Sequence, residues 1–511
     1  MSEQKPNIVF IVTDQEAYYR HGWDGGLGPA RPNLERLGRE GIYFNRSYSC
    51  CPLCTPARRS MLTGLYPHNH GFLTLDYKEN SEERDHGILY PLLAEQGYRL
   101  FSFGKWHTGP GTAYDYGCEG YSIPGYGNPY TTPEYMAYCQ ERGIEPASFS
   151  LEHVFLEAVS PDEPEPGPGY QCHGDEFHPH VTGVLETETE SHDAQFVANL
   201  ACDKLRELVD GEEAAPFFLR VDIWGPHAPY LPAQEYLEMY PPEEIERYGN
   251  FDDDLSDKPL VYLKEWNKPL GKDNRLVIPS YLPWSEWQRI LSYVYGQITQ
   301  VDAAGGQILD TLDELGLAEN TLVIWTADHG DAVGTFGGHF GKETPLNEEV
   351  LRVPLAVRWP VQIAPNPASD YLTSTVDLPV TILDAAGTNF REPVDGESLL
   401  NLVEDGKLVE KTEKWRDDVI SESHGHHWEP VNGRSVATDR YKYAIYQYHS
   451  TPDYLDEVDT TMPMQELYDL EQDPYQLNNL ADDPTYADII ADFRRRLDKW
   501  QLQTRDPITF D

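Results

Sequence analysis

The chain has 511 residues, with 39 Lys and Arg against 86 Asp and Glu, so its formal net charge is -47. A field of this sign repels nucleic acid and anionic membranes, and no apolar run approaches the ~20 residues of a membrane helix, so we exclude nucleic acid and membrane as partners. An anionic ligand would need a local pocket of positive charge to overcome the same repulsion.

The first residues, MSEQKPNIVFIVTD, lead directly into a strand-like segment. They lack the basic region, apolar run and small-residue cleavage site of a secretory signal. Seven cysteines are spread thinly over the chain, an odd number that fits a reducing compartment better than a disulfide framework. We therefore expect a cytoplasmic protein.

Four apolar segments predict buried strands, and each ends in polar residues. They span residues 7–13, 99–103, 217–224 and 321–327. Their apolar residues are continuous rather than alternating, which is typical of parallel strands that helices cover on both faces. Apolar residues at helical spacing occur at 31–41, 88–97 and 284–317. This alternation predicts an α/β fold.

The polar residues that follow these strands have complementary chemistry. Ligands of open α/β sheets bind beyond the carboxyl ends of the strands, so these residues should meet at one edge. Asp14, Asp328 and His329 suit a hard divalent cation. One such residue alone is more often a helix cap or a surface side chain, but four strand ends with the same chemistry favour a shared site. The members that could hold an anion or transfer protons are Lys105, His107 and His227.

Residues 50–64, CCPLCTPARRSMLTG, contain three cysteines beside prolines and arginines. Cys51 and Cys54 form a CxxC, but the sequence has no second CxxC to complete a structural zinc site, and a thioredoxin-like unit would be a small domain. The residues after Cys54, Thr55-Pro56-Ala57-Arg58, indicate a constrained turn into a helix. The N-terminal amides of such a helix favour a nearby negative charge.

The segment 52–64 matches the sulfatase signature at every constrained position, and further matches follow in order along most of the chain. They are PNIVFIVTDQ near the start, GKWHTG at 104–109, PHAPY at 226–230, the pair Asp328-His329, Lys342 in HFGKET, RYKY at 440–443 and ELYDLEQDPYQLNNLA at 466–481. The chain thus resembles the type I, formylglycine-dependent sulfatases of the alkaline phosphatase superfamily. This resemblance implies a mixed, mostly parallel sheet between helix layers, followed by a smaller C-terminal antiparallel sheet.

We expect residues 1–386 to form the catalytic α/β domain, with inserts at about 109–183 and 231–283. The first insert is rich in Tyr, Pro and Gly, and we expect it to form loops over the site. Residues 387–511 are expected to form the C-terminal subdomain. Its strand patterns lie at 418–422, 434–438 and 441–446, and an amphipathic helix lies near 486–501.

The resemblance implies hydrolysis of a sulfate monoester to an alcohol and sulfate. In the family, a separate formylglycine-generating enzyme oxidises the cysteine of C-x-P-x-R, here Cys54, to an aldehyde that is hydrated. One hydroxyl attacks sulfur, and deprotonation of the other, with His107 as the base, releases sulfate. His227 would assist the leaving group. The residues expected to supply positive charge at the sulfate oxygens are Arg58, Lys105 and Lys342.

The resemblance also implies one divalent metal ion. Calcium is expected because the donors are mainly oxygen, whereas magnesium and manganese are alternatives because His329 adds a nitrogen. Gln15 is either a weak ligand or a neighbour of the metal. The implied metal-binding residues are Asp14, Gln15, Cys54, Asp328 and His329.

Two departures from the family pattern leave an alternative open. Many sulfatases carry Asp-Asp and Asp-Asn where this chain has Asp14-Gln15 and Asp328-His329, a combination that resembles phosphonate monoester and phosphodiester hydrolases, and the late pair also resembles choline sulfatases. Lys105 and His107 keep the sulfatase pattern, so a small-molecule or saccharide sulfate ester is expected. A non-catalytic, metal-dependent anion-binding protein is the alternative from another class, and an oligomer is possible.

Overall fold

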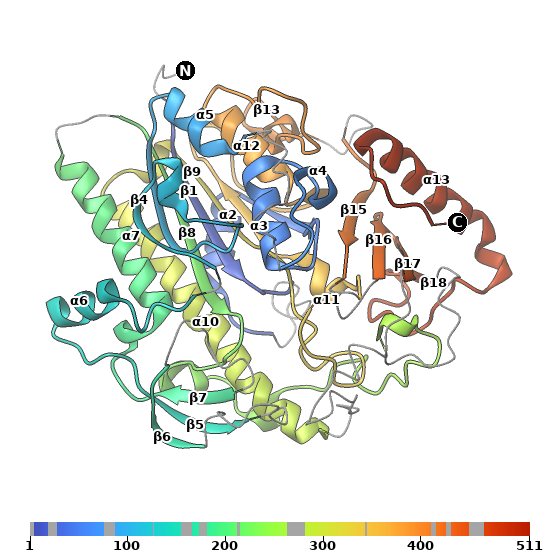
Figure 1. Cartoon of the computed structure of the whole chain (residues 1–511), viewed down its shortest axis with the longest axis horizontal. Coiled ribbons are helices and arrows are strands. Elements are labelled where there is room, and N and C mark those ends of the chain that lie inside the picture. Colours follow the sequence, from blue (N-terminus) through green and yellow to red (C-terminus); the bar gives the residue numbers. More distant parts are fainter. Residues whose placement is uncertain are drawn as a thin grey trace.

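The computed structural model describes residues 5–18, 28–75, 87–125, 127–154, 166–172, 181–211, 215–262, 282–342, 345–409, 415–425, 431–448 and 464–510. A central sheet lies between two layers of helices, and a small sheet with the last helix lies to one side (Figure 1). The predicted α/β class is confirmed. Among the residues described, no helix is both long and apolar enough to cross a membrane.

The central sheet has nine strands. They are β1 Asn7–Asp14, β2 Ile42–Tyr48, β3 Arg99–Lys105, β4 Glu119–Ile123, β8 Phe217–Pro226, β9 Thr321–Ala327, β10 Arg352–Val353, β11 Leu355–Arg358 and β12 Asn366–Ser374. Their order is β10-β2-β11-β9-β1-β8-β3-β4, with β12 paired to β2. The four strands predicted from sequence are the adjacent β9, β1, β8 and β3, which run parallel. Their carboxyl ends therefore meet at one edge.

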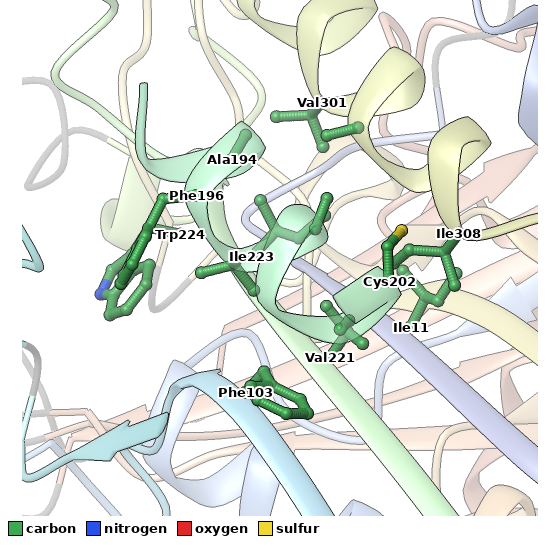
Figure 2. Close-up of a cluster of buried hydrophobic side chains, with 14 of the residues drawn as sticks. Ile11, Phe103, Ala194, Phe196, Cys202, Val221, Ile223, Trp224, Val301 and Ile308 are labelled. Carbon is green, nitrogen blue, oxygen red and sulfur yellow. The ribbon is translucent and has the colours of Figure 1, made fainter. Parts of the chain in front are cut away.

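Helices cover both faces of this sheet, which explains the continuous apolar pattern of its strands. On one face, Val9 and Ile11 of β1 pack under α2 (Pro32–Glu40), α7 (Asp193–Asp210) and α10 (Trp284–Glu314). Figure 2 shows part of this cluster. On the other face, Phe10 and Val12 pack under α3 (Cys54–Thr63), α5 (Leu89–Glu95) and α12 (Asp377–Ala385). The three predicted helices correspond to α2, α5 and α10.

The first insert is more regular than we expected. It contributes β4 to the central sheet, a helix α6 (Pro133–Arg142), and the three-stranded antiparallel sheet β6-β5-β7 (Gly167–Tyr170, Phe149–Val154, Val181–Leu185). The expectation of loops is wrong for these segments because several of the tyrosines are core residues. Tyr121, Tyr135 and Tyr138 make edge-to-face contacts with Phe196 at centroid distances of 4.9–5.3 Å. In the second insert, α8 spans Gln234–Leu237, and residues 263–281 lie outside the described part.

The C-terminal segment forms an antiparallel sheet of β15 Val419–Ser423, β16 Val431–Ala437, β17 Tyr441–Tyr448 and β18 Met464–Asp469, followed by α13 Ala487–Thr504. This confirms the three predicted strands and the helix, and adds β18. A short hairpin joins β13 (Val403–Glu404) to β14 (Lys407–Leu408), and short helices span Pro67–His70 (α4) and Glu348–Leu351 (α11). The division at residue 386 stays a prediction.

The C-terminal sheet packs against the segment that precedes Cys54. Cys50, Cys51 and Leu53 share one buried cluster with Ile420 of β15 and Leu497 of α13. Ser421 donates a hydrogen bond of 2.6 Å to the carbonyl of Ser49. Cys50 and Cys51 are therefore packing residues, which anchor the start of α3 to the C-terminal sheet.

Gly104 generates the first prediction, because β3 and β8 approach each other closely there. Its φ is +108°, and a Cβ would lie 1.9 Å from the carbonyl oxygen of Asp222. Gly104→Ala should lower the free energy of unfolding by about 2–4 kcal/mol, through backbone strain and overpacking together. Gly97→Ala is the control, since Gly97 also has a positive φ but no atom within 4 Å of the added Cβ. Urea unfolding measures both; equal losses would contradict the close approach.

Candidate active site

Four predicted metal-binding residues lie together at the carboxyl edge of the sheet. Ligand atoms of Asp14, Cys54, Asp328 and His329 all lie within 4.8 Å of one another, and all four side chains are buried. Asp14 ends β1, Asp328 and His329 follow β9, and Cys54 begins α3. The order of β1 and β9 in the sheet and the position of α3 thus bring together Cys54 and His329, which are 275 positions apart in sequence.

Cys54 lies at the centre of this cluster. It is the first residue of α3, and its Sγ lies 3.0 Å from Lys342 Nζ, 3.1 Å from His329 Nε2 and 3.7 Å from Asp14 Oδ1. Burial raises the pKa of the Cys54 thiol, but Lys105 and Lys342 outweigh burial and hold it well below its usual value. The helix N-terminus acts in the same direction. The surroundings therefore stabilise negative charge at this side chain.

The donor set fits a divalent cation. The carbonyl of Gly330 can only accept, so His329 donates to it from Nδ1 (2.9 Å), which leaves Nε2 as the ring nitrogen that faces the cluster and would bind a cation when deprotonated. Burial lowers the pKa of His329, but Asp328 and Cys54 outweigh burial and raise it, so binding of a cation would displace a proton from this nitrogen. Asp328 Oδ1 accepts backbone N–H groups from Gln15 and His329, each at 2.9 Å. These contacts fix the orientation of both side chains before any ion binds.

Gln15 borders the cluster, but its side chain is bound elsewhere. Its Oε1 accepts from Lys342 Nζ at 2.7 Å, and its Nε2 donates to Asp331 Oδ2 at 2.8 Å. Asp331 also accepts from the Tyr230 hydroxyl at 3.1 Å. Asp331 was not among the residues predicted for the site, although it stands only two residues after His329. The structure thus makes Gln15 a link between Asp331 and Lys342.

Arg58 lies behind the ligands, surrounded by carboxylates. Its Nε lies 2.8 Å from Asp328 Oδ2, its Nη1 2.7 Å from Asp222 Oδ1 and its Nη2 3.3 Å from Asp14 Oδ2. Burial raises the pKa of Asp14, but Lys105 and Arg58 outweigh it and lower it to about 2. The sequence predicted Arg58 as a source of charge for the substrate; in the structure, each of its three nitrogens faces an aspartate. Asp222 was not among the residues predicted for the site.

The remaining predicted basic residues surround Cys54. Lys105 Nζ forms an ion pair with Asp14 Oδ2, and His107 is hydrogen bonded to Cys54. Burial and Lys105 lower the pKa of His107. Burial and Lys342 lower the pKa of His227 to about 3, and its Nδ1 donates to the carbonyl of Ala228 at 2.7 Å. Both imidazoles are therefore neutral near pH 7, while the lysines carry the positive charge.

Comparison with known proteins identifies the family of the chain. The family model described as Sulfatase matches residues 6–388, and the model described as N-sulphoglucosamine sulphohydrolase, C-terminal, matches residues 336–503. The uncharacterised sulfatase YidJ of Escherichia coli (strain K12) is 28% identical over 99% of this chain and 88% of its own length. An N-acetylglucosamine-6-sulfatase of Capra hircus is 26% identical over 94% of this chain and 80% of its own length.

The fold also matches solved structures. The crystal structure of the phosphonate monoester hydrolase of Agrobacterium radiobacter has a TM-score of 0.70 and 22% identity, covering 98% of this chain and 96% of that one. This likeness confirms the alkaline phosphatase-like fold expected from the sequence. The Sulfatase model covers most of the chain, and the predicted metal and sulfate-binding side chains converge around Cys54. The chain therefore belongs to the sulfatase family of the alkaline phosphatase superfamily, hydrolases that act on sulfuric ester bonds.

Proposed function

We propose that this sulfatase cleaves sulfate monoesters through a formylglycine made from Cys54, together with one Ca²⁺ ion. The family implies a formylglycine and a divalent metal in general. The observation that carries the finer proposal is the place of Cys54 Sγ, which lies between the Lys342 ammonium and the metal-binding donors. Once oxidised, the same side chain would present its oxygens to both. A separate formylglycine-generating enzyme is the maturation partner that this chemistry requires.

The metal would be held by Asp14, Asp328 and His329 together with the residue at position 54. When bound, the ion supplies positive charge at the sulfate and lowers the pKa of a hydroxyl beside it. Two carboxylates favour Ca²⁺, and the imidazole of His329 makes Mn²⁺ and Mg²⁺ the alternatives. Gln15 is not part of the proposed set, because its amide oxygen accepts from Lys342.

The chain's own groups divide the acid and base work. His107 is neutral and hydrogen bonded to Cys54, so it can accept a proton from a hydroxyl at that position. Lys342 lies 3.0 Å from Sγ, where its charge would stabilise a negative oxygen. His227 is neutral in the free enzyme; the negative charge of a bound sulfate ester would raise its pKa and let it protonate the leaving group.

We propose a saccharide sulfate as the substrate class, in preference to another small sulfate ester. The support is the C-terminal match to the N-sulphoglucosamine sulphohydrolase model and the similarity to an N-acetylglucosamine-6-sulfatase. A reducing, cytoplasmic location is proposed as well. All seven cysteines are free and buried, which suits a compartment that keeps thiols reduced. Cell fractionation tests the location, and recovery of the protein outside the cytoplasm would contradict it.

A second candidate activity is hydrolysis of phosphonate monoesters or phosphodiesters. The pair Asp328-His329 and the likeness in fold to a phosphonate monoester hydrolase favour it. Lys105 and His107, which lie close to Cys54, favour the sulfate ester. Parallel measurements of kcat/KM on an aryl sulfate, an aryl phosphonate monoester and a phosphate diester distinguish them. We expect the sulfate to be preferred; a large preference for either phosphorus ester would overturn the assignment.

Replacing Cys54 tests the nucleophile. Cys54→Ala should lower kcat on an aryl sulfate on the order of 10⁴-fold or more, because no other group can form the covalent intermediate. Cys51→Ala is the matched control: it lies in the same turn, within the packing cluster, and should keep its activity. Peptide mass spectrometry should find an aldehyde at position 54 in the active wild type. A fully active enzyme with an unmodified thiol there would contradict the formylglycine, and a thiol form that binds sulfate without any turnover would indicate the anion-binding alternative.

Removing the metal tests the cation. Treatment with a chelator should abolish activity, and Ca²⁺ should restore it. Free Ca²⁺ at 100 times its Kd should raise the free energy of unfolding by about 2.7 kcal/mol, since only the folded site binds it. Asp14→Asn should remove this stabilisation, whereas Asp488→Asn, an exposed change on α13, should not. Restoration by Mg²⁺ or Mn²⁺ but not by Ca²⁺ would contradict the choice of metal.

A further inference from the structure

Two charged residues interrupt the apolar strand β8. Arg220 and Asp222 are two positions apart, so both point to the same face of the sheet, the one that α3 covers. Asp222 pairs in register with Val12 of β1 and Gly104 of β3, which places it in the middle of the sheet. Arg220 and Asp222 are 0% and 1% exposed. Charges this deep are costly unless each is paired and hydrogen bonded, so their contacts need an explanation.

Asp222 is shared by two guanidinium groups. Its Oδ1 accepts from Arg58 Nη1 at 2.7 Å and from Arg220 Nη2 at 2.8 Å, while its Oδ2 accepts from Arg220 Nε at 2.7 Å. Arg220 forms a bidentate pair with Asp222, and its guanidinium also lies 5.5 Å from the centroid of the Phe10 ring. Arg220 therefore holds the Asp222 carboxylate in place, and Oδ1 of this carboxylate also accepts from Arg58.

The other two contacts of Arg58 reach the metal-binding carboxylates. Arg58 contacts one oxygen of each of these carboxylates, Asp14 Oδ2 and Asp328 Oδ2. Asp14 Oδ1 is left facing Cys54 Sγ, and Asp328 Oδ1 is left facing the N–H groups of Gln15 and His329. A planar guanidinium held at three edges cannot rotate without breaking one ion pair, so the third contact sets the direction of the other two.

We propose that Asp222 is a positioning residue of this sulfatase, which orients the metal-binding carboxylates through Arg58. It touches neither the substrate nor the ion. Its carboxylate holds Arg58 in the plane from which the guanidinium contacts both Asp14 and Asp328, and it prevents Arg58 from turning toward the bound sulfate. The proposal rests on the sulfatase reaction and on the cation site proposed above.

Asp222→Asn is the direct test, because it keeps the shape of the side chain and removes its charge. If the asparagine oxygen takes the place of Oδ1, it still accepts from Arg58, but its N–H groups then face Arg220 Nε; in the other orientation its N–H groups face Arg58 itself. In either orientation the negative charge that holds the two guanidinium groups is lost, so Arg58 is held less firmly. We expect Ca²⁺ affinity and kcat to fall about 10–100-fold. KM for an aryl sulfate should change little, because Asp222 does not contact the substrate. A purely structural role would instead lower the fraction folded and leave kcat per folded molecule unchanged.

Two further variants keep the test decisive. The double variant Asp222→Asn/Arg220→Gln removes the uncompensated charge, so it should recover thermal stability without recovering kcat or Ca²⁺ affinity. Asp377→Asn is the matched control, because Asp377 is also a fully buried carboxylate paired with an arginine, Arg416, at 2.7 Å. It lies at the start of α12 and should lose stability while keeping kcat and Ca²⁺ affinity.

The measurements are calorimetric titration of chelator-treated protein with Ca²⁺, thermal unfolding in chelator, kinetics normalised to the formylglycine content, and a crystal structure of metal-free Asp222→Asn. In that structure Arg58 should have left Asp14 or Asp328. If Arg58 keeps both contacts, or if the folded variant keeps wild-type kcat and Ca²⁺ affinity, the proposal is wrong. Wild-type protein that does not bind Ca²⁺ would contradict the proposed metal instead, and the position of Arg58 in the variant would still decide the role of Asp222.

Discussion

The structure of this sulfatase depends on the balance of buried charge at the carboxyl edge of its sheet. Asp14 ends β1, Asp222 lies further inside the sheet on the adjacent strand β8, and Asp328 directly follows β9 on the other side of β1; each of these carboxylates is buried. Isolated carboxylates in such a place would take up protons. Arg58, on α3, contacts all three aspartates at nitrogen–oxygen distances of 2.7–3.3 Å. These contacts fix α3 over the sheet, and they thereby position Cys54, the first residue of this helix. One guanidinium therefore connects strand order, helix position and the reacting side chain.

This arrangement separates two kinds of positive charge. Arg58 compensates the aspartates, with each of its three nitrogens against a carboxylate oxygen, whereas Lys342 lies beside Cys54 and Lys105 beside Asp14. The lysines are thus the groups that can meet an anionic substrate. They provide the local positive pocket that a chain with a net charge of -47 needs, and the buried site has little dielectric screening to weaken their effect. The neutral state of His107 and His227 is a consequence of the same lysines, together with burial.

The sequence was sufficient to predict the parts of the fold that are locally periodic. The strands β1, β3, β8 and β9 are continuously apolar because both faces are covered, and that pattern is visible without a structure. The polar residues at their ends predicted which side chains would cluster, because parallel strands end at one edge. Other strands were missed. β2, which pairs with β10, β11 and β12, reads IYFNRSY and carries polar residues in its second half. β18 contains Glu466 and Asp469, whose partners are distant in sequence.

Side-chain pairing could not be predicted in the same way. The opposite charges of Arg220 and Asp222, two residues apart in an apolar strand, are the only local sign of the buried pair, and they do not reveal that Arg58 is its third member. The partner of Gln15 depends on Asp331 and Lys342 converging from one loop, which no local pattern encodes. Loops were expected in the insert around Tyr135 because a segment rich in Tyr, Pro and Gly can form either a loop or a packed aromatic cluster, and composition does not distinguish the two.

The central claim is that Arg58 organises the aspartates while the lysines and histidines contact the anion. A crystal structure of the mature enzyme with a divalent cation and inorganic sulfate tests it most directly. We expect a single cation between Asp14, Asp328 and His329, sulfate in contact with Lys105 and Lys342, and Arg58 still paired with all three aspartates. A structure in which Arg58 leaves Asp222 and binds the sulfate would contradict it.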